Sequence, residues 1–198
     1  MIDIQTFIGS QVAPHLDAVA ALRIAVFRDW PYLYAGDTGY EKKYLATYAQ
    51  SAESLFVLAF DDDQVIGAST GIPLTDETAA FQQPFLDRDI ALEDVFYFGE
   101  SVLLHDYRGL GLGHRFFDER ERYARHLGRF DLTAFCAVER DADDSRRPAT
   151  HRPNDVFWSK RGYRRQDDMF CQLEWQEIGH DVASCHRLRF WLRPLDQQ

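Results

Sequence analysis

Three glycines in alternate positions, Gly109, Gly111 and Gly113, lie between an apolar run and an amphipathic run. The run before them, residues 95–104, predicts a buried strand, and residues 112–127 repeat apolar side chains at helical spacing. The first amides of a helix are unpaired and carry the positive end of its dipole, so they bind anions. Glycine lets a phosphate approach these amides because no Cβ stands in the way. The sequence therefore predicts an anion site, of a kind that suits a diphosphate.

The spacing of these glycines distinguishes between the known phosphate-binding motifs. The chain contains no G-x-x-x-x-G-K-[ST], which excludes the P-loop of nucleoside triphosphatases. The glycines alternate with single residues and do not follow G-x-G-x-x-G, and no repeated βαβ array surrounds them, which disfavours a dinucleotide fold. A tight turn with surplus glycine and no ligand is the remaining alternative.

Composition bounds the class of protein. With 198 residues, 45% of them hydrophobic, the chain can bury one substantial core, so we expect a single domain over residues 1–198. The 22 Lys and Arg against 32 Asp and Glu give a formal charge of -10, which disfavours nucleic acid or anionic lipid as a partner and suits a cationic substrate. Neither a disulfide framework nor a metal site is indicated by the spacing of Cys136, Cys171 and Cys185. No apolar run is long enough for a membrane span and no signal peptide is evident, so we expect a soluble, cytoplasmic protein.

Hydrophobic periodicity predicts alternating strands and helices along the chain. The expected strands are residues 2–7, 54–60, 64–72, 95–104, 132–138, 163–165, 170–175 and 188–192. The expected helices are residues 13–27, 40–49, 112–127 and 155–160, with a short helix inside the loop 73–94. The strand, helix and strand within residues 95–138 favour a right-handed parallel crossover. The pattern indicates a mixed α+β domain with a C-terminal extension from about residue 176.

Glu100 interrupts the apolar run, next to Gly99 and Ser101. A carboxylate in a central strand costs several kcal/mol unless it is paired, hydrogen-bonded or protonated. A catalytic role would explain its presence. An ion pair with an arginine, or a strand bend that exposes it to solvent, would explain it equally well.

An aromatic loop follows the first expected helix, and two interpretations of it stay open. It contains Arg28, Tyr32 and Tyr34 and is broken by Pro31 and Gly36. The loop either folds over the core, or it presents these three side chains to a substrate.

Two segments of the chain carry a resemblance to a known family. Residues 108–113, R-G-L-G-L-G, match the motif [R/Q]-x-x-G-x-[G/A], and residues 157–163, F-W-S-K-R-G-Y, are similar to F-Y-x-K-x-G-[F/Y]. Both motifs are typical of the GCN5-related N-acetyltransferase (GNAT) superfamily, which the chain resembles over most of residues 1–175. The resemblance implies an α/β/α sandwich whose mixed, mostly antiparallel sheet has a central parallel, splayed strand pair flanked by helices.

The resemblance also implies a site for acetyl-coenzyme A. The backbone amides expected to hold its diphosphate are those of Arg108, Gly109, Leu110, Gly111, Leu112 and Gly113. The strand backbone at Val102, Leu103 and Leu104 would pair with the pantetheine arm, and the acetyl carbonyl would lie near the backbone of Ser101 and Val102.

Catalytic roles follow from the same resemblance. Glu100 is the first choice for the general base and Glu139 the second. Trp158 stands in the cofactor site where a tyrosine acid is usual, and His151 where an asparagine is frequent. These departures leave the general acid open among water, Ser159 and Tyr123.

Three functions remain open from the sequence. The leading hypothesis is acetyl transfer from acetyl-coenzyme A to a primary amine of a small molecule or protein, without a metal. The second is a non-catalytic module that binds acyl-coenzyme A for sensing or interaction, and the third is a site for another phosphorylated ligand. The strand at residues 189–192 permits a homodimer.

Overall fold

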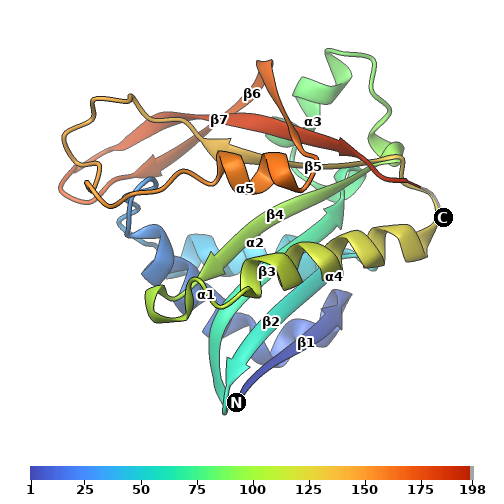
Figure 1. Cartoon of the computed structure of the whole chain (residues 1–198), viewed down its shortest axis with the longest axis horizontal. Helices are drawn as coiled ribbons and strands as arrows, with labels where there is room; N and C mark the ends of the chain where they lie inside the picture. The colour runs from blue at the N-terminus through green and yellow to red at the C-terminus, as the bar shows by residue number, and fades with distance from the viewer. Residues whose placement is uncertain (197–198) are drawn as a thin grey trace.

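Seven strands form one mixed sheet in the order β1-β2-β3-β4-β5-β7-β6 in the computed structural model, which describes residues 1–196. The strands are β1 (Ile2–Ile8), β2 (Leu55–Asp61), β3 (Gln64–Pro73), β4 (Val95–Leu103), β5 (Leu132–Val138), β6 (Arg164–Gln176) and β7 (Ala183–Pro194). The α-helices are α1 (Leu16–Phe27), α2 (Thr38–Gln50), α3 (Ala79–Leu86), α4 (Leu112–Leu127) and α5 (Asp155–Lys160). Figure 1 shows helices on both faces of the sheet, as the expected α/β/α sandwich requires.

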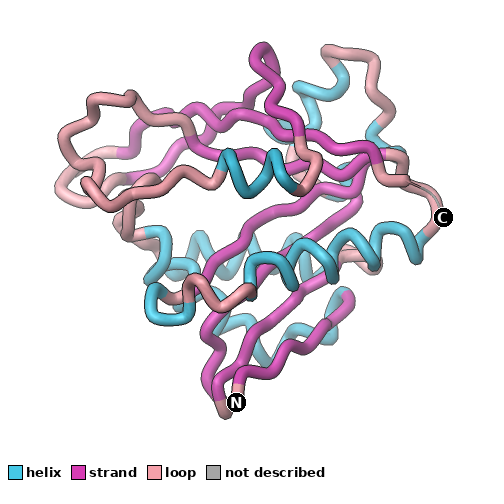
Figure 2. The backbone as a smooth tube through the Cα atoms, in the orientation of Figure 1, coloured by secondary structure: helices cyan, strands magenta, loops and turns pink. Residues whose placement is uncertain are grey.

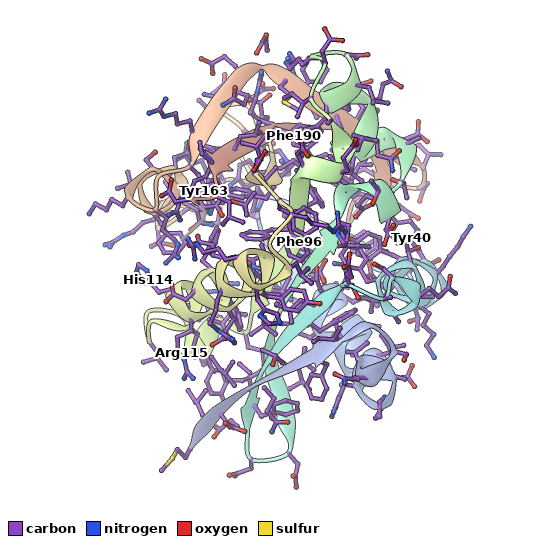
Figure 3. All side chains as sticks on the ribbon, turned by 90° about the vertical axis from the view of Figure 1, so that its right-hand side faces the viewer. Tyr40, Phe96, His114, Arg115, Tyr163 and Phe190 are labelled. Atoms are coloured by element: carbon purple, nitrogen blue, oxygen red, sulfur yellow. The ribbon has the colours of Figure 1, made fainter. Side chains whose placement is uncertain are left out.

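Two hydrophobic cores lie on opposite faces of the sheet. One core is formed by apolar side chains of α1, α2 and α3, and the other by those of α4 with Phe157 and Trp158 of α5. Figure 3 shows His114 on the α4 side and Tyr40 on the α2 side, with Phe96 of β4 between them. Strand β4 is therefore covered on both faces, as its continuous apolar sequence predicts.

Strands β4 and β5 are the parallel pair that the strand, helix and strand sequence predicts. Their register joins only Val95–Tyr97 to Leu132–Ala134. Beyond these residues the strands diverge toward the end at which α4 begins, so the sheet is splayed there (Figure 1). The described neighbours elsewhere in the sheet pair antiparallel.

A β-bulge in β4 decides which way Glu100 points. Ser69 pairs with Ser101 and Gly71 with Phe98, so Thr70 alone stands opposite Gly99 and Glu100. In a regular strand Phe98 and Glu100 would share the α4 face, because side chains alternate with a period of two. The extra residue reverses this alternation and turns Glu100 toward α1 and α2.

The end of the chain differs from its expected pattern. The two short strands at 163–165 and 170–175 are one strand, β6, with an irregular register between Arg165 and Phe170. The strand expected at 188–192 is longer, and as β7 it lies between β5 and β6 (Figure 2). The residues after 176, expected as an extension, thus supply an interior strand of the sheet.

The hairpin of β2 and β3 shows why its second strand contains a glycine. A Cβ at Gly67 would lie 2.7 Å from Leu103 Cδ1 and 3.0 Å from Phe116 Cζ. Glycine at this position therefore leaves room for these two side chains, and the register also shifts beside it, opposite Ala59 and Phe60.

Candidate active site

The start of α4 offers unpaired backbone amides. Gly109 and Gly111 have φ of 80° and 81°, and a Cβ built at either residue meets nothing within 4 Å. Gly111 is the N-cap, no side chain caps the helix, and its first turn carries no acidic residue. The Arg108 N–H, expected among the diphosphate amides, donates instead to the His105 carbonyl (3.1 Å). Within residues 1–196 the amides of 109–113 have no acceptor, so they fit a diphosphate.

Strand β4 presents a free backbone edge beside these amides. The Leu104 N–H donates to the Ile66 carbonyl of β3 (3.0 Å). Because backbone groups alternate in direction along a strand, the N–H and C=O groups of Leu104 and Val102 both point toward β3. Ser101 and Leu103 then point their backbone groups toward the splay. Consistent with this, the exposed Arg108 side chain donates from Nε to the Leu103 carbonyl (3.3 Å). The register thus favours Ser101 over Val102 as the donor to an acyl oxygen.

Glu100 is buried and forms the ion pair that the sequence left open. Its Oε2 lies 2.5 Å from Arg23 Nη1 and 3.3 Å from the Tyr44 hydroxyl. Arg23 also pairs with Glu41, and together the two carboxylates raise the pKa of this arginine although burial opposes the charge. The other oxygen, Glu100 Oε1, is buried and has no hydrogen-bond partner in the described residues. One carboxylate oxygen is therefore anchored, and the other is buried without a hydrogen-bond partner within residues 1–196.

Arg120 of α4 is a site residue that sequence reasoning missed. Its guanidinium is 1% exposed and donates to the carbonyls of Thr70 and Glu100 and to Ser101 Oγ. One feature of the sequence indicates that Arg120 is buried: it lies in the apolar stripe of α4, four residues after Phe116. The side chain holds the β4 bulge from the face opposite Arg23.

Glu139 lies at the end of β5 in a cluster of arginines. Its carboxylate is 2.7 Å from Arg165, 3.0 Å from Arg189 and 3.4 Å from Arg187. Burial alone would raise the pKa of Glu139, but the hydrogen bonds from Arg189 and Arg165 lower it below its ordinary value. A carboxylate with a lowered pKa is a poor proton acceptor, which weakens Glu139 as a candidate base.

The aromatic loop is held in place by Arg140, which follows β5. Arg140 donates from Nε to the Pro31 carbonyl (2.6 Å) and from Nη2 to the Tyr32 carbonyl (2.9 Å). Tyr34 is buried, and its hydroxyl accepts the Asp37 N–H. Tyr34, one of the three residues expected to face a substrate, is therefore buried within the fold.

The other two loop residues differ in their surroundings. Arg28 is exposed at the end of α1, and the Tyr32 ring packs between Phe27 and Trp175. Burial raises the pKa of Tyr32, which keeps its hydroxyl protonated. Of the three, Arg28 alone is exposed.

Trp158 packs among aromatic rings. Its centroid lies 5.0 Å from that of Phe135 and 5.2 Å from that of Trp191. Tyr123 is buried against Phe96 on the α4 face, and Ser159 is exposed. The structure thus brings no acidic hydroxyl from these candidates to the free edge of β4.

Two features bear on cofactors and membranes. In the part of the chain that the structure describes, no three His, Cys, Asp or Glu side chains are grouped so as to hold a metal ion. None of the helices there is long and apolar enough to cross a bilayer.

Comparisons at the level of sequence point to one family. The family model described as "Acetyltransferase (GNAT) family" matches residues 20–149, a range that runs from α1 through β5 and includes the start of α4. A comparison with curated protein sequences gives no match.

Solved structures share the fold at low sequence identity. An N-acetyltransferase from Staphylococcus aureus Mu50 has a TM-score of 0.60 at 11% identity, covering 98% of this chain and 99% of that one. Ribosomal-protein-alanine N-acetyltransferase from Brucella melitensis has a TM-score of 0.60 at 13% identity, with 96% and 99% covered. The structure of yncA from Salmonella typhimurium with its cofactor acetyl-CoA has a TM-score of 0.57 at 12% identity, with 98% and 95% covered.

Proposed function

Because the chain belongs to the acetyltransferase (GNAT) family, we propose that it moves an acetyl group from acetyl-coenzyme A to a primary amine of a small molecule or protein. One observation carries the proposal: the unpaired amides of residues 109–113 and the free edge of β4 lie at the same end of the splay. A diphosphate and an amide-bearing arm joined in one molecule fit that arrangement.

Several backbone groups would hold the co-substrate. The amides of 109–113 bind its diphosphate, and the N–H and C=O of Leu103 hydrogen-bond to its pantetheine amides. The Ser101 N–H faces the acyl oxygen, where a fixed donor stabilises the negative charge that develops during attack. Bound acetyl-coenzyme A supplies the activated acyl group.

Glu100 acts on the acceptor amine. An amine attacks only when neutral, so a base must remove a proton from its ammonium form. Glu100 Oε1 has no partner among the described residues, while Arg23 and Tyr44 hold Oε2 and fix the carboxylate. The same buried carboxylate favours a cationic acceptor, in keeping with the acidic chain.

A thermal-shift titration with coenzyme A tests the binding part of the proposal. A ligand that binds only the folded state raises the melting temperature as its concentration exceeds the dissociation constant. An unchanged melting temperature at millimolar coenzyme A would exclude both the transferase and the acyl-coenzyme A module.

A thiol-release assay over a panel of amines and amine-bearing peptides tests the reaction. We expect turnover with at least one acceptor, and Glu100→Gln should lower kcat by about a hundredfold or more, the usual contribution of a general base. If coenzyme A binds without turnover, the non-catalytic acyl-coenzyme A module replaces the transferase as the proposed function. Trp158, which packs against Trp191 and stands where a tyrosine acid is usual, agrees with that alternative.

A further inference from the structure

Two tyrosines of α2 connect Glu100 to a second buried carboxylate. The Tyr44 hydroxyl lies 3.3 Å from Glu100 Oε2 and 3.1 Å from the Tyr48 hydroxyl. The Tyr48 hydroxyl donates to Glu77 Oε1 at 2.5 Å. The oxygens of Glu100, Tyr44, Tyr48 and Glu77 thus lie in one continuous chain of hydrogen-bond distances, in which the single Tyr44 proton points to Glu100 or to Tyr48.

This chain runs from the centre of the sheet to the edge of the molecule. Glu77 is 6% exposed and immediately precedes α3, where Thr78 donates its N–H to Glu77 Oε2 (2.8 Å). Its neighbours Thr75, Asp76 and Thr78 are exposed, so the buried Glu77 lies next to the surface. Glycine at position 99 permits the arrangement, because a Cβ there would collide with the Tyr48 hydroxyl.

The proton balance of amine acylation calls for such an exit. An ammonium acceptor loses two protons when it becomes an amide, and the departing thiolate takes up one. Each turnover therefore releases one proton, which must leave a buried base before the next cycle. Glu100 is 7% exposed and its Oε1 faces the acceptor in the proposed reaction, so the Tyr44 contact at Oε2 offers the proton a second way out.

We propose that Tyr44, Tyr48 and Glu77 form a relay that carries this proton from Glu100 to solvent. The inference rests on the proposed acetyl transfer. It assigns functional roles to three residues that make no contact with the free edge of β4, and it accounts for tyrosines at positions 44 and 48 of α2.

The transfer balances atom by atom. Glu100 Oε1 takes the proton from the amine, which neutralises the carboxylate and weakens its ion pair with Arg23, so that rotation about Cγ–Cδ brings this O–H to the Tyr44 oxygen. The Tyr44 oxygen accepts this proton while its own passes to the Tyr48 oxygen, and the Tyr48 proton passes to Glu77 Oε1. Three O–H bonds break and three form, leaving Glu100 as a carboxylate and Glu77 as a carboxylic acid. Glu77 then releases its proton to water.

The surroundings keep the two tyrosines neutral. Burial raises the pKa of Tyr44 and of Tyr48 well above the ordinary value, so both hydroxyls stay protonated and pass protons without ionising. Burial also raises the pKa of Glu77, which makes it a better proton acceptor. Charged and titratable groups from several elements interact with this chain, namely Arg23 of α1, Tyr40 and Glu41 of α2, Tyr97 of β4, Arg120 of α4, Cys136 of β5 and Tyr32 of the aromatic loop.

Turnover in dilute buffer tests the relay with the variants Glu77→Gln and Tyr48→Phe. We expect kcat to fall by about tenfold or more in each, with KM for the acceptor little changed. Added small-molecule buffer should restore kcat by carrying the proton, which a purely structural defect would not allow. The control is Tyr40→Phe, since Tyr40 stacks on Tyr44 from the same helix and its hydroxyl donates no hydrogen bond within residues 1–196.

Unchanged kcat in both variants, or a loss that buffer does not restore in folded protein, would overturn the relay. Infrared titration of Glu77, identified by the Glu77→Gln difference, gives a readout without turnover. Coupled sites share their protons, so Glu100→Gln should shift that titration. If the wild-type protein is inactive, the proposed acetyl transfer is wrong. If Glu100→Gln leaves the Glu77 titration unchanged, the proposed proton connection between Glu100 and Glu77 is wrong, whatever the activity.

Discussion

Arg120 is a buried cation whose described partners include no carboxylate. Burial lowers its pKa to about 10, so it remains charged at neutral pH. Its donors reach two carbonyls, those of Thr70 and Glu100, which the β4 bulge removes from regular pairing. The guanidinium also lies over the Phe98 and Phe117 rings, at 4.2 Å and 4.6 Å from their centroids. Arg120 therefore replaces ladder hydrogen bonds that the bulge cannot make.

Arg120→Met should destabilise the fold by about 2–4 kcal/mol, because it leaves buried carbonyls without a donor. It should also lower kcat more than it raises KM, since the Ser101 N–H loses its fixed direction. Urea denaturation and steady-state kinetics measure the two effects, and Arg120→Lys, which keeps the charge, should recover part of both. If the stability falls while kcat is unchanged, Arg120 supports the fold and does not position the site.

Sequence reasoning identified Glu100 but not the side chains that determine its role. A carboxylate in an apolar run is visible in a single sequence. Its partners Arg23 and Tyr44 are 77 and 56 positions away, and the bulge that turns Glu100 toward them depends on a cross-strand register. Such long-range pairings leave no local pattern.

At the scale of the element, α4 begins and ends with a glycine in the left-handed region. Gly111 at the start has φ of 81° and Gly128 at the end has φ of 70°. A Cβ built at either position meets no atom within 4 Å, so a side chain costs mainly backbone strain at both. The two ends of the helix therefore provide a matched pair of substitutions.

Gly111→Val and Gly128→Val should each cost about 1–2 kcal/mol of stability from the left-handed backbone. Only Gly111→Val should abolish coenzyme A binding, because its side chain stands among the amides expected to hold the diphosphate. Isothermal titration with coenzyme A distinguishes the two variants. Equal affinities would place the diphosphate elsewhere.

Elements were predicted well where their pattern is local. The hairpin, α2, β4, α4 and β5 follow the expected ranges, and the parallel pairing of β4 with β5 follows from the crossover between them. The position of β7 between β5 and β6 was not predictable, because an antiparallel strand can pair with any exposed edge. The sequence of β7 alternates too weakly to select one.

For the whole molecule, two carboxylates join distant parts of the chain through arginines. Glu139 connects β5 to Arg165 of β6 and Arg189 of β7, and Glu177 lies 2.5 Å from both Arg140 and Arg146. Burial alone would raise the pKa of each carboxylate, but the arginine hydrogen bonds lower it in both. Their ionised forms are therefore favoured by folding.

Because the pKa of both carboxylates is lowered in the folded protein, we expect the fold to lose stability in acid. A lowered folded pKa contributes stability that is fully present above the unfolded value, about 4.3 for Glu, and is lost as the pH falls through the folded value. The double variant Glu139→Gln, Glu177→Gln should melt below the wild type at pH 7, and the two melting curves should converge toward pH 3. Melting temperatures that differ by the same amount at every pH would contradict this assignment.

The placement of β7 also fixes an order of events during synthesis. Strand β6 is made before β7, yet it reaches the rest of the sheet only through β7. During synthesis β6 therefore has no native neighbour in the sheet until β7 has been made. Within the sheet, closure by β7 is thus a late step that follows translation of the segment matched by the family model.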